Sequence, residues 1–172
     1  MSSNYRKHPD HCWNPCAFPI SEPPRPEIQS AFRAVRNGTN EALTVIQNNP
    51  KQVLYPNQQY DLMSEYDANT SNFSPAKKGI YSIIASVGFT PDDPAEEDFR
   101  VTLSIKVGTD IVASDNEFYD EGTNNIVSVS TNIQLKAGDV VQVLVTSTVT
   151  GKILSIPAST HFEATRFPSP TM

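Results

Sequence analysis

Apolar and polar residues alternate with a period of two along much of this chain. The clearest run is 99–107, where every odd position is apolar and every even position is polar. Successive side chains of a β-strand point to opposite faces, so this alternation is typical of a strand with one face on a core and the other toward solvent. Three further rows follow the same pattern, with their mainly apolar faces along 81–89, 127–135 and 141–145.

Turn-forming residues separate these rows. They occur at 91–94, 108–110, 122–124 and 137–139. Shorter candidate strands lie at 31–36, 43–47, 52–55, 110–114 and 159–167, and no helical periodicity of useful length is present. Seven or more strands at this spacing predict an all-β sandwich or jelly roll. A chain of 172 residues suits one such domain with a tail.

Charge and hydropathy exclude two classes of protein. Thirteen Lys and Arg residues against nineteen Asp and Glu residues give a formal net charge of −6, which argues against a nucleic-acid binder. No apolar run approaches the length of about 18 residues that a membrane-spanning helix needs. We therefore expect no nucleic-acid partner and no membrane span.

Residues 1–30 differ in composition from the rest of the chain. They hold six of the 14 prolines and show no hydrophobic period. Proline fixes φ and removes a backbone donor, so we expect an extended tail rather than a strand or helix. Basic residues occur near the start, but no apolar stretch follows them, and no secretory signal peptide is predicted.

Both cysteines, Cys12 and Cys16, lie in this tail. With His8 and His11 they could ligate a metal, but the spacing does not match the usual zinc motifs. They could instead close a small disulfide loop, cross-link to another chain, or be incidental thiols in a leader. We expect a tether, and we divide the chain into a tail at 1–30, a head at 31–168 and a short C-terminal tail at 169–172.

The aromatic and glycine spacing in the middle of the chain is unusual. The residues concerned are Tyr55, Asp61, Tyr66, Phe73, Gly79 and Tyr81. Their spacing resembles the signature of the globular head of complement component 1q, in the tumour-necrosis-factor-like (TNF-like) jelly-roll superfamily. Segments 31–34 and 135–143, the latter with Gly138 and Asp139, resemble the first strand and a later turn and strand of that family. Segment 159–162, ending at Phe162, resembles the opening of its last strand.

The resemblance covers residues 30–167, with departures from the family pattern. Tyr55 stands where the family usually has Phe, and Ile83 and Ala85 stand where it usually has aromatics. Segment 163–166 replaces a small, glycine-containing strand end. These departures indicate a divergent branch, such as a bacterial spore-surface or phage member.

The resemblance implies a ten-stranded jelly roll that assembles as a homotrimer with both termini near its base. The signature residues would then serve core and subunit packing. Apolar residues on a second face, including Ile84, Ile126, Val140 and Leu144, would be covered in part by neighbouring subunits.

The implied function is that of a non-enzymatic structural or adhesive head at a cell, spore or filament surface. The tail would attach it to a surface scaffold or filament protein, in an extracellular, spore-surface (exosporium, filament-tip) or virion location. One alternative is a ligand-binding module that uses the acidic loops at 90–98 and 115–124. Another is a phage tail-fibre tip.

Two acidic groups in these loops contain the candidate calcium ligands Asp92, Asp93, Asp115 and Glu117. Calcium prefers several carboxylate and carbonyl oxygens, but the spacing matches no specific calcium loop, and a solvated acidic loop is the alternative. No phosphate loop or nucleophile motif occurs, so we expect no catalytic residues and no other cofactor.

Overall fold

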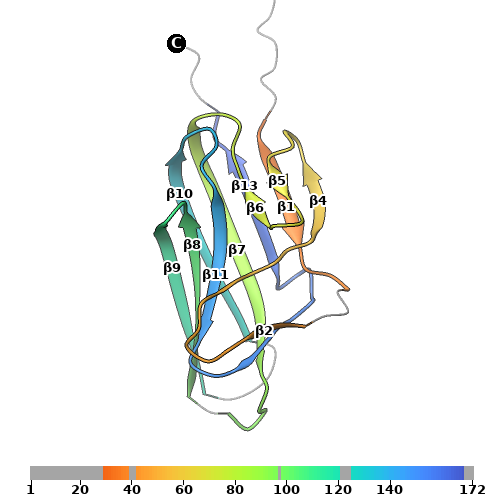
Figure 1. Ribbon diagram of the computed structural model, residues 1–172, viewed down its shortest axis with the longest axis vertical. Helices are drawn as coiled ribbons and strands as arrows, with labels where there is room; N and C mark the ends of the chain where they lie inside the picture. The colour runs from red at the N-terminus through yellow and green to blue at the C-terminus, as the bar shows by residue number, and fades with distance from the viewer. Residues whose placement is uncertain (1–28, 39–41, 97, 121–124, 169–172) are drawn as a thin grey trace, which may run out of the picture.

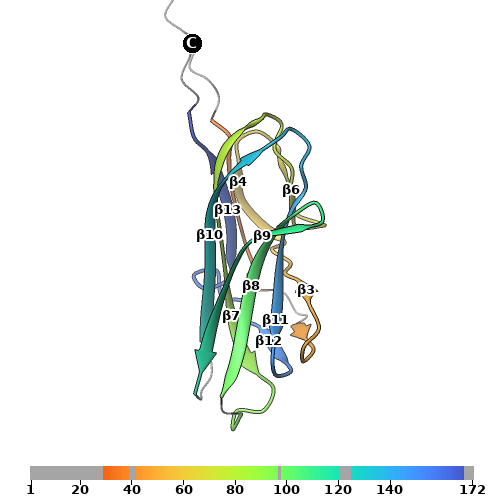
Figure 2. The ribbon, with the colours of Figure 1, turned by 90° about the vertical axis from the view of Figure 1, so that its left-hand side faces the viewer.

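The computed structural model describes residues 29–38, 42–96, 98–120 and 125–168. These residues form two antiparallel sheets that face each other (Figures 1 and 2). No helix long and apolar enough to cross a membrane occurs among them. The all-β sandwich predicted from the sequence is confirmed by these two sheets.

The described residues contain thirteen strands. The first sheet consists of β1 (Ala31–Val35), β2 (Leu43–Val45), β4 (Asn57–Asp61), β7 (Gly79–Pro91), β10 (Asn125–Leu135), β12 (Gly151–Ile153) and β13 (His161–Arg166). The second sheet consists of β3 (Lys51–Gln52), β5 (Tyr66–Asp67), β6 (Asn72–Phe73), β8 (Phe99–Val107), β9 (Asp110–Tyr119) and β11 (Val141–Ser147).

Long strand β7 is the axis of the first sheet. Its residues 81–86 pair with β13 along one side and with β10 along the other, so both ladders share this stretch of β7. Beyond β13 the sheet continues through β1 to β4, and near the end of β7 it continues through β12 to β2. The second sheet runs β5-β6-β11-β8-β9, with β3 also paired to β11.

The predicted strand at 99–107 has the same bounds in the structure. The strand expected at 110–114 is longer, because β9 stays paired with β8 as far as Tyr119. Only Lys51–Gln52 forms a strand near the one expected at 52–55. Strands β4, β5, β6 and β12 were not predicted, because they have two to five residues and no alternation of their own. The nine strands expected from the sequence and these four make up the thirteen, whereas the resemblance implied ten.

Alternation along the long strands produces the core between the sheets. On β7 the odd positions from 81 to 89 are fully buried, and the odd positions of β8 from 99 to 105 face them from the second sheet. Burial of such side chains is worth roughly 1.5–3 kcal/mol each. The apolar residues of the alternating rows therefore form the core between the sheets and stabilise their packing.

An aromatic cluster joins the sheets at one end. Phe32 of β1 stacks on Tyr66 and Phe73, with ring centroids 4.7 and 4.8 Å away, and contacts the edge of Phe162 at 5.0 Å. Tyr81 contacts Phe73 from β7 at 5.7 Å. Because β1 begins and β13 ends beside this cluster, the described chain enters and leaves at the same end (Figure 1). We call this the base, and the opposite end the distal end.

Replacing Tyr81 tests the packing of this cluster. Its side chain is 0% exposed, and its hydroxyl donates a hydrogen bond to the Lys77 carbonyl at 2.8 Å. Tyr81→Ala should lower the free energy of unfolding by about 3–5 kcal/mol, because it removes a buried ring. Tyr81→Phe should cost only about 1 kcal/mol, because it removes the hydrogen bond alone. Tyr60→Ala on β4, where the side chain is 43% exposed, is the control. Denaturant unfolding measures all three, and an unchanged midpoint for Tyr81→Ala would contradict this packing.

Candidate functional site

The predicted aromatic signature residues lie in the core, and Asp61, Gly79, Gly138 and Asp139 lie outside it. The aromatic members, Tyr55, Tyr66, Phe73, Tyr81 and Phe162, are all buried in one hydrophobic cluster. The Tyr66 hydroxyl donates to the Tyr55 carbonyl at 2.7 Å, and burial raises the pKa of both phenols. These hydroxyls therefore stay protonated at neutral pH, as hydrogen-bond donors inside the core rather than groups presented to a ligand.

Asp61 explains the spacing between the first two signature aromatics. Its carboxylate accepts hydrogen bonds from the backbone N–H groups of Tyr66 at 2.8 Å and Met63 at 3.3 Å. Such a side chain closes a turn by replacing backbone partners. The turn places Tyr66 against Phe32, so Asp61 acts by positioning the core.

The signature glycines have steric and conformational roles. A Cβ on Gly79 would lie 2.6 Å from Nε of Arg166, so a larger residue there would displace the Arg166 side chain. Gly138 has a φ of 83°, a conformation that favours glycine. Asp139 closes the same turn by accepting a hydrogen bond from the Lys136 backbone N–H at 2.8 Å.

A buried carboxylate at the base was missed by the sequence reasoning. Glu65 is only 6% exposed. One of its oxygens accepts the Ser30 hydroxyl and the other accepts the Ala76 backbone N–H at 2.7 Å. It thus ties the start of the head to the segment before β7. A lone glutamate outside any alternating run carries no signal in the sequence.

The structure does not bring the four candidate calcium ligands together. Asp92 pairs with Lys152 at 2.9 Å, and Asp93 accepts the Ala95 backbone N–H at 2.9 Å. Asp115 and Glu117 lie on β9 instead. Across the described ranges, no group of three or more His, Cys, Asp or Glu side chains could hold a metal ion. Cys12 and Cys16, with His8 and His11, lie outside the described residues.

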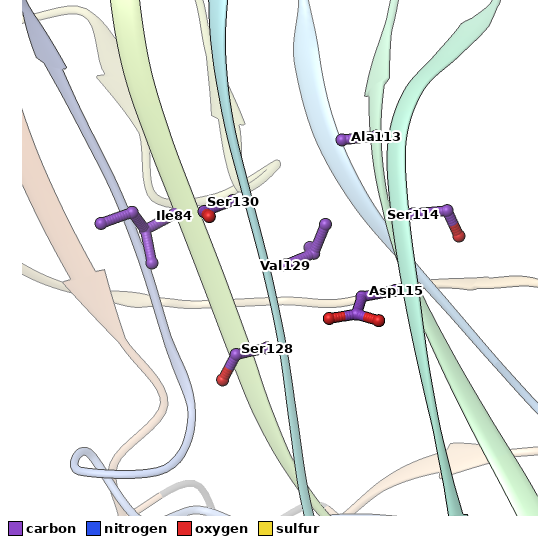
Figure 3. A pocket seen from close by; sticks show the side chains of 7 residues that line it. All are labelled: Ile84, Ala113, Ser114, Asp115, Ser128, Val129 and Ser130. Carbon is purple, nitrogen blue, oxygen red and sulfur yellow. The ribbon is translucent and has the colours of Figure 1, made fainter.

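The sandwich has an open edge formed by β9 and β10. Within the described part of the chain, β9 is paired only with β8, and β10 only with β7. A groove of about 430 Å³ lies between these strands (Figure 3). Asp115 and Val129 point toward each other across it. The lining is completed by Ile84, Ala113, Ser114, Ser128 and Ser130.

The outer face of the first sheet continues from this edge. It carries the exposed side chains of Ile80 and Ile126 and the partly buried Ile84 among small serines. An ion pair between Arg33 and Glu163 lies on the same face. Segment 154–160 covers Ser86 and Gly88 on the distal part of this face, and among the described residues no third sheet or helix covers the rest.

Ile84 and Leu144 do not share a face, contrary to the expectation. Ile84 is on β7 in the first sheet, whereas Leu144 is on β11 in the second. Both point away from the common core, because their neighbours Ile83, Val143 and Val145 are fully buried. They therefore mark opposite outer surfaces of the sandwich.

Comparisons with known proteins agree with this architecture at the level of fold. No protein-family model and no curated protein matches the sequence. Among solved structures, Eiger TNF from S. frugiperda matches with a TM-score of 0.55 and 14% identity, over 84% of this chain and 96% of that one. Murine APRIL at pH 5.0 matches with a TM-score of 0.60 and 13% identity, over 81% and 99%.

The globular domain of zebrafish complement 1qA protein also matches. The TM-score is 0.53 and the identity 16%, over 79% of this chain and 93% of that one. Identities this low carry information on the fold, and all three alignments span most of the described head. The chain therefore has the jelly-roll fold of TNF-like and complement 1q globular domains.

Proposed function

We propose that this protein is a non-enzymatic homotrimeric head with a structural or adhesive role at an extracellular, spore or filament surface, held there by its N-terminal segment. The observation that supports this most directly is the open edge at β9 and β10 beside the exposed part of the outer face of the first sheet, around Ile84 and Ile126. Domains of this fold are commonly trimeric. A phage tail-fibre tip would use the same architecture.

The open edge needs a covering partner. Strands β9 and β10 have ten and eleven residues, and each leaves a row of backbone N–H and C=O groups outside any ladder of the described sheets. Proteins protect such edges, because they invite uncontrolled pairing. A second copy can place its outer first-sheet face, with Ile84 and Ile126, against this edge. Repeated around an axis, that contact closes into a finite ring.

The chemistry-bearing side chains fit binding better than catalysis. Among the described residues the only histidine is His161, which is partly buried beside the Arg33–Glu163 pair on the first sheet. Burial, and then Arg33, lower its pKa, although Glu163 opposes this. The imidazole is therefore neutral at pH 7 and adds no positive charge to a face that a neighbouring copy would cover.

A second candidate function is ligand binding at the distal end. A pocket of about 260 Å³ there is lined by Gln47, Asp92, Asp93, Glu96, Val149 and Thr150. Asp92 is paired with Lys152, so Asp93 and Glu96 are the carboxylates that would favour a basic partner, and such binding weakens with salt. This function would use the loop that follows β7 and would be compatible with a trimer.

The assembly is tested by mass in solution. Light scattering after size exclusion should give three times the 18.9 kDa subunit mass. Ile126→Asp should shift the protein toward monomer, because it places a charge where the neighbouring copy would pack. Leu144→Asp, on the opposite outer surface, should leave the mass unchanged. Circular dichroism shows whether each variant is folded, and a wild-type monomer would contradict the proposal.

The tether is tested separately. Replacing both Cys12 and Cys16 with Ser should leave the mass of the head unchanged, because neither residue belongs to the strands described. It should also release the protein from its surface, measured as the fraction that remains with the cell or particle after washing. Full retention of the double variant would show that these thiols do not hold the head in place.

A further inference from the structure

The outer face of the second sheet has a composition unlike the rest of the molecule. On β8 the even positions point outward, away from the fully buried odd ones. Paired positions on β9 and β11 extend this surface to both sides. Over these three strands the face consists of Arg100, Thr102, Ser104 and Lys106 on β8, Ile111, Ser114, Asn116 and Phe118 on β9, and Gln142, Leu144 and Thr146 on β11.

Over β8, β9 and β11 this face carries two cations and no carboxylate, in a chain whose net charge is −6; the carboxylate of Asp67 on β5 lies at the far edge of the sheet, beside Asn72. Alternation along β9 is the cause, because Asp115 and Glu117 pair with the buried positions of β8 and so stand on its other side. Asp98 and Asp120 lie beyond the face at the distal end, where their backbones meet. No ion pair of the described residues involves Arg100 or Lys106.

Phe118 is the most exposed large apolar side chain of the described residues, at 69%. The guanidinium carbon of Arg100 lies 5.6 Å from the centroid of its ring. A single exposed apolar residue is ordinary, but this ring packs against a cation and stands opposite it in the ladder. The pair offers an apolar platform and an anion-binding group side by side.

Hydroxyl and amide groups continue the face toward the base. The hydroxyl oxygens of Ser104 and Ser114 lie 2.9 Å apart, and Thr102 and Asn116 form the row between them and Phe118. Such groups both donate and accept hydrogen bonds. The six residue steps from Arg100 to Lys106 correspond to roughly 20 Å of strand, so the two cations stand at opposite ends of a flat polar strip.

These features together favour a saccharide with acidic groups. An aromatic side chain combines a rigid apolar surface with low entropic cost, hydroxyls and amides match a polyol, and a guanidinium binds a carboxylate with two parallel hydrogen bonds. A protein partner would favour a continuous apolar centre. Here Phe118, Leu144 and Ile111 are separated by polar rows.

We propose that the outer face of the second sheet binds an acidic polysaccharide, with Phe118 beneath a sugar ring and Arg100 and Lys106 on its acid groups. The whole site lies within one subunit, so it does not depend on assembly into a trimer. A trimer would present three such faces and raise the apparent affinity for a long chain.

The test uses the full-length protein and polygalacturonate as the probe, with affinity measured by biolayer interferometry at low ionic strength. We expect binding that weakens with salt and is absent for neutral dextran. Phe118→Ala should weaken binding by roughly fivefold or more, and Arg100→Gln with Lys106→Gln by at least as much. Lys136→Gln and Tyr60→Ala, an exposed cation and an exposed aromatic elsewhere, are the matched controls and should bind as wild type.

Four results would overturn the proposal. One is the absence of polygalacturonate binding at low salt by folded protein. The second is binding that the Phe118 and Arg100/Lys106 variants leave unchanged. The third is binding of neutral dextran with equal affinity. The fourth is equal affinity for poly-glutamate with the same dependence on these variants, which would assign the face to an acidic polypeptide instead.

Discussion

The packing of Phe32 between rings from both sheets is the contact on which the base of the molecule depends. Tyr66 and Phe73 reach it from the second sheet and Phe162 from the first. Neither β5 nor β6 is longer than two residues, so their own ladders cannot hold them. Stacking on Phe32, with the turn closed by Asp61, fixes these short strands and closes one side of the sandwich.

The other side of the sandwich stays open, and this asymmetry leaves the surfaces that function can use. The inner faces of both sheets are buried in the core. The second outer face, the part of the first outer face that segment 154–160 does not cover, and the edge at β9 and β10 remain exposed. The first outer face combines small serines with isoleucines and suits close packing of a second copy. The second combines cations, hydroxyls and one exposed ring, which suits a soluble polar ligand. The aromatic signature residues, which gave the strongest signal in the sequence, lie on neither of these outer faces.

Prediction from the sequence succeeded for the long strands, in which the apolar residues of an alternating row are the residues buried in the core. The bounds of β8 and the inward positions of β7 follow from a period of two, because each strand buries one face. It failed for β4 and β12, which have no pattern of their own and form by pairing with β1 and β7. It also grouped Asp115 and Glu117 with the distal acidic loop, because it ended β9 too early.

The sequence by itself determined the fold class and the inward positions of the long strands, since alternation and turn chemistry act over short stretches of chain. Only the tertiary structure decided which surfaces those strands present together. Ile84 and Leu144 look alike in the sequence but lie on opposite outer surfaces, because β7 and β11 belong to different sheets. Arg100 and Phe118 are 18 positions apart and meet because β8 and β9 pair in one register. Register and sheet order depend on long-range pairing, which no local pattern encodes.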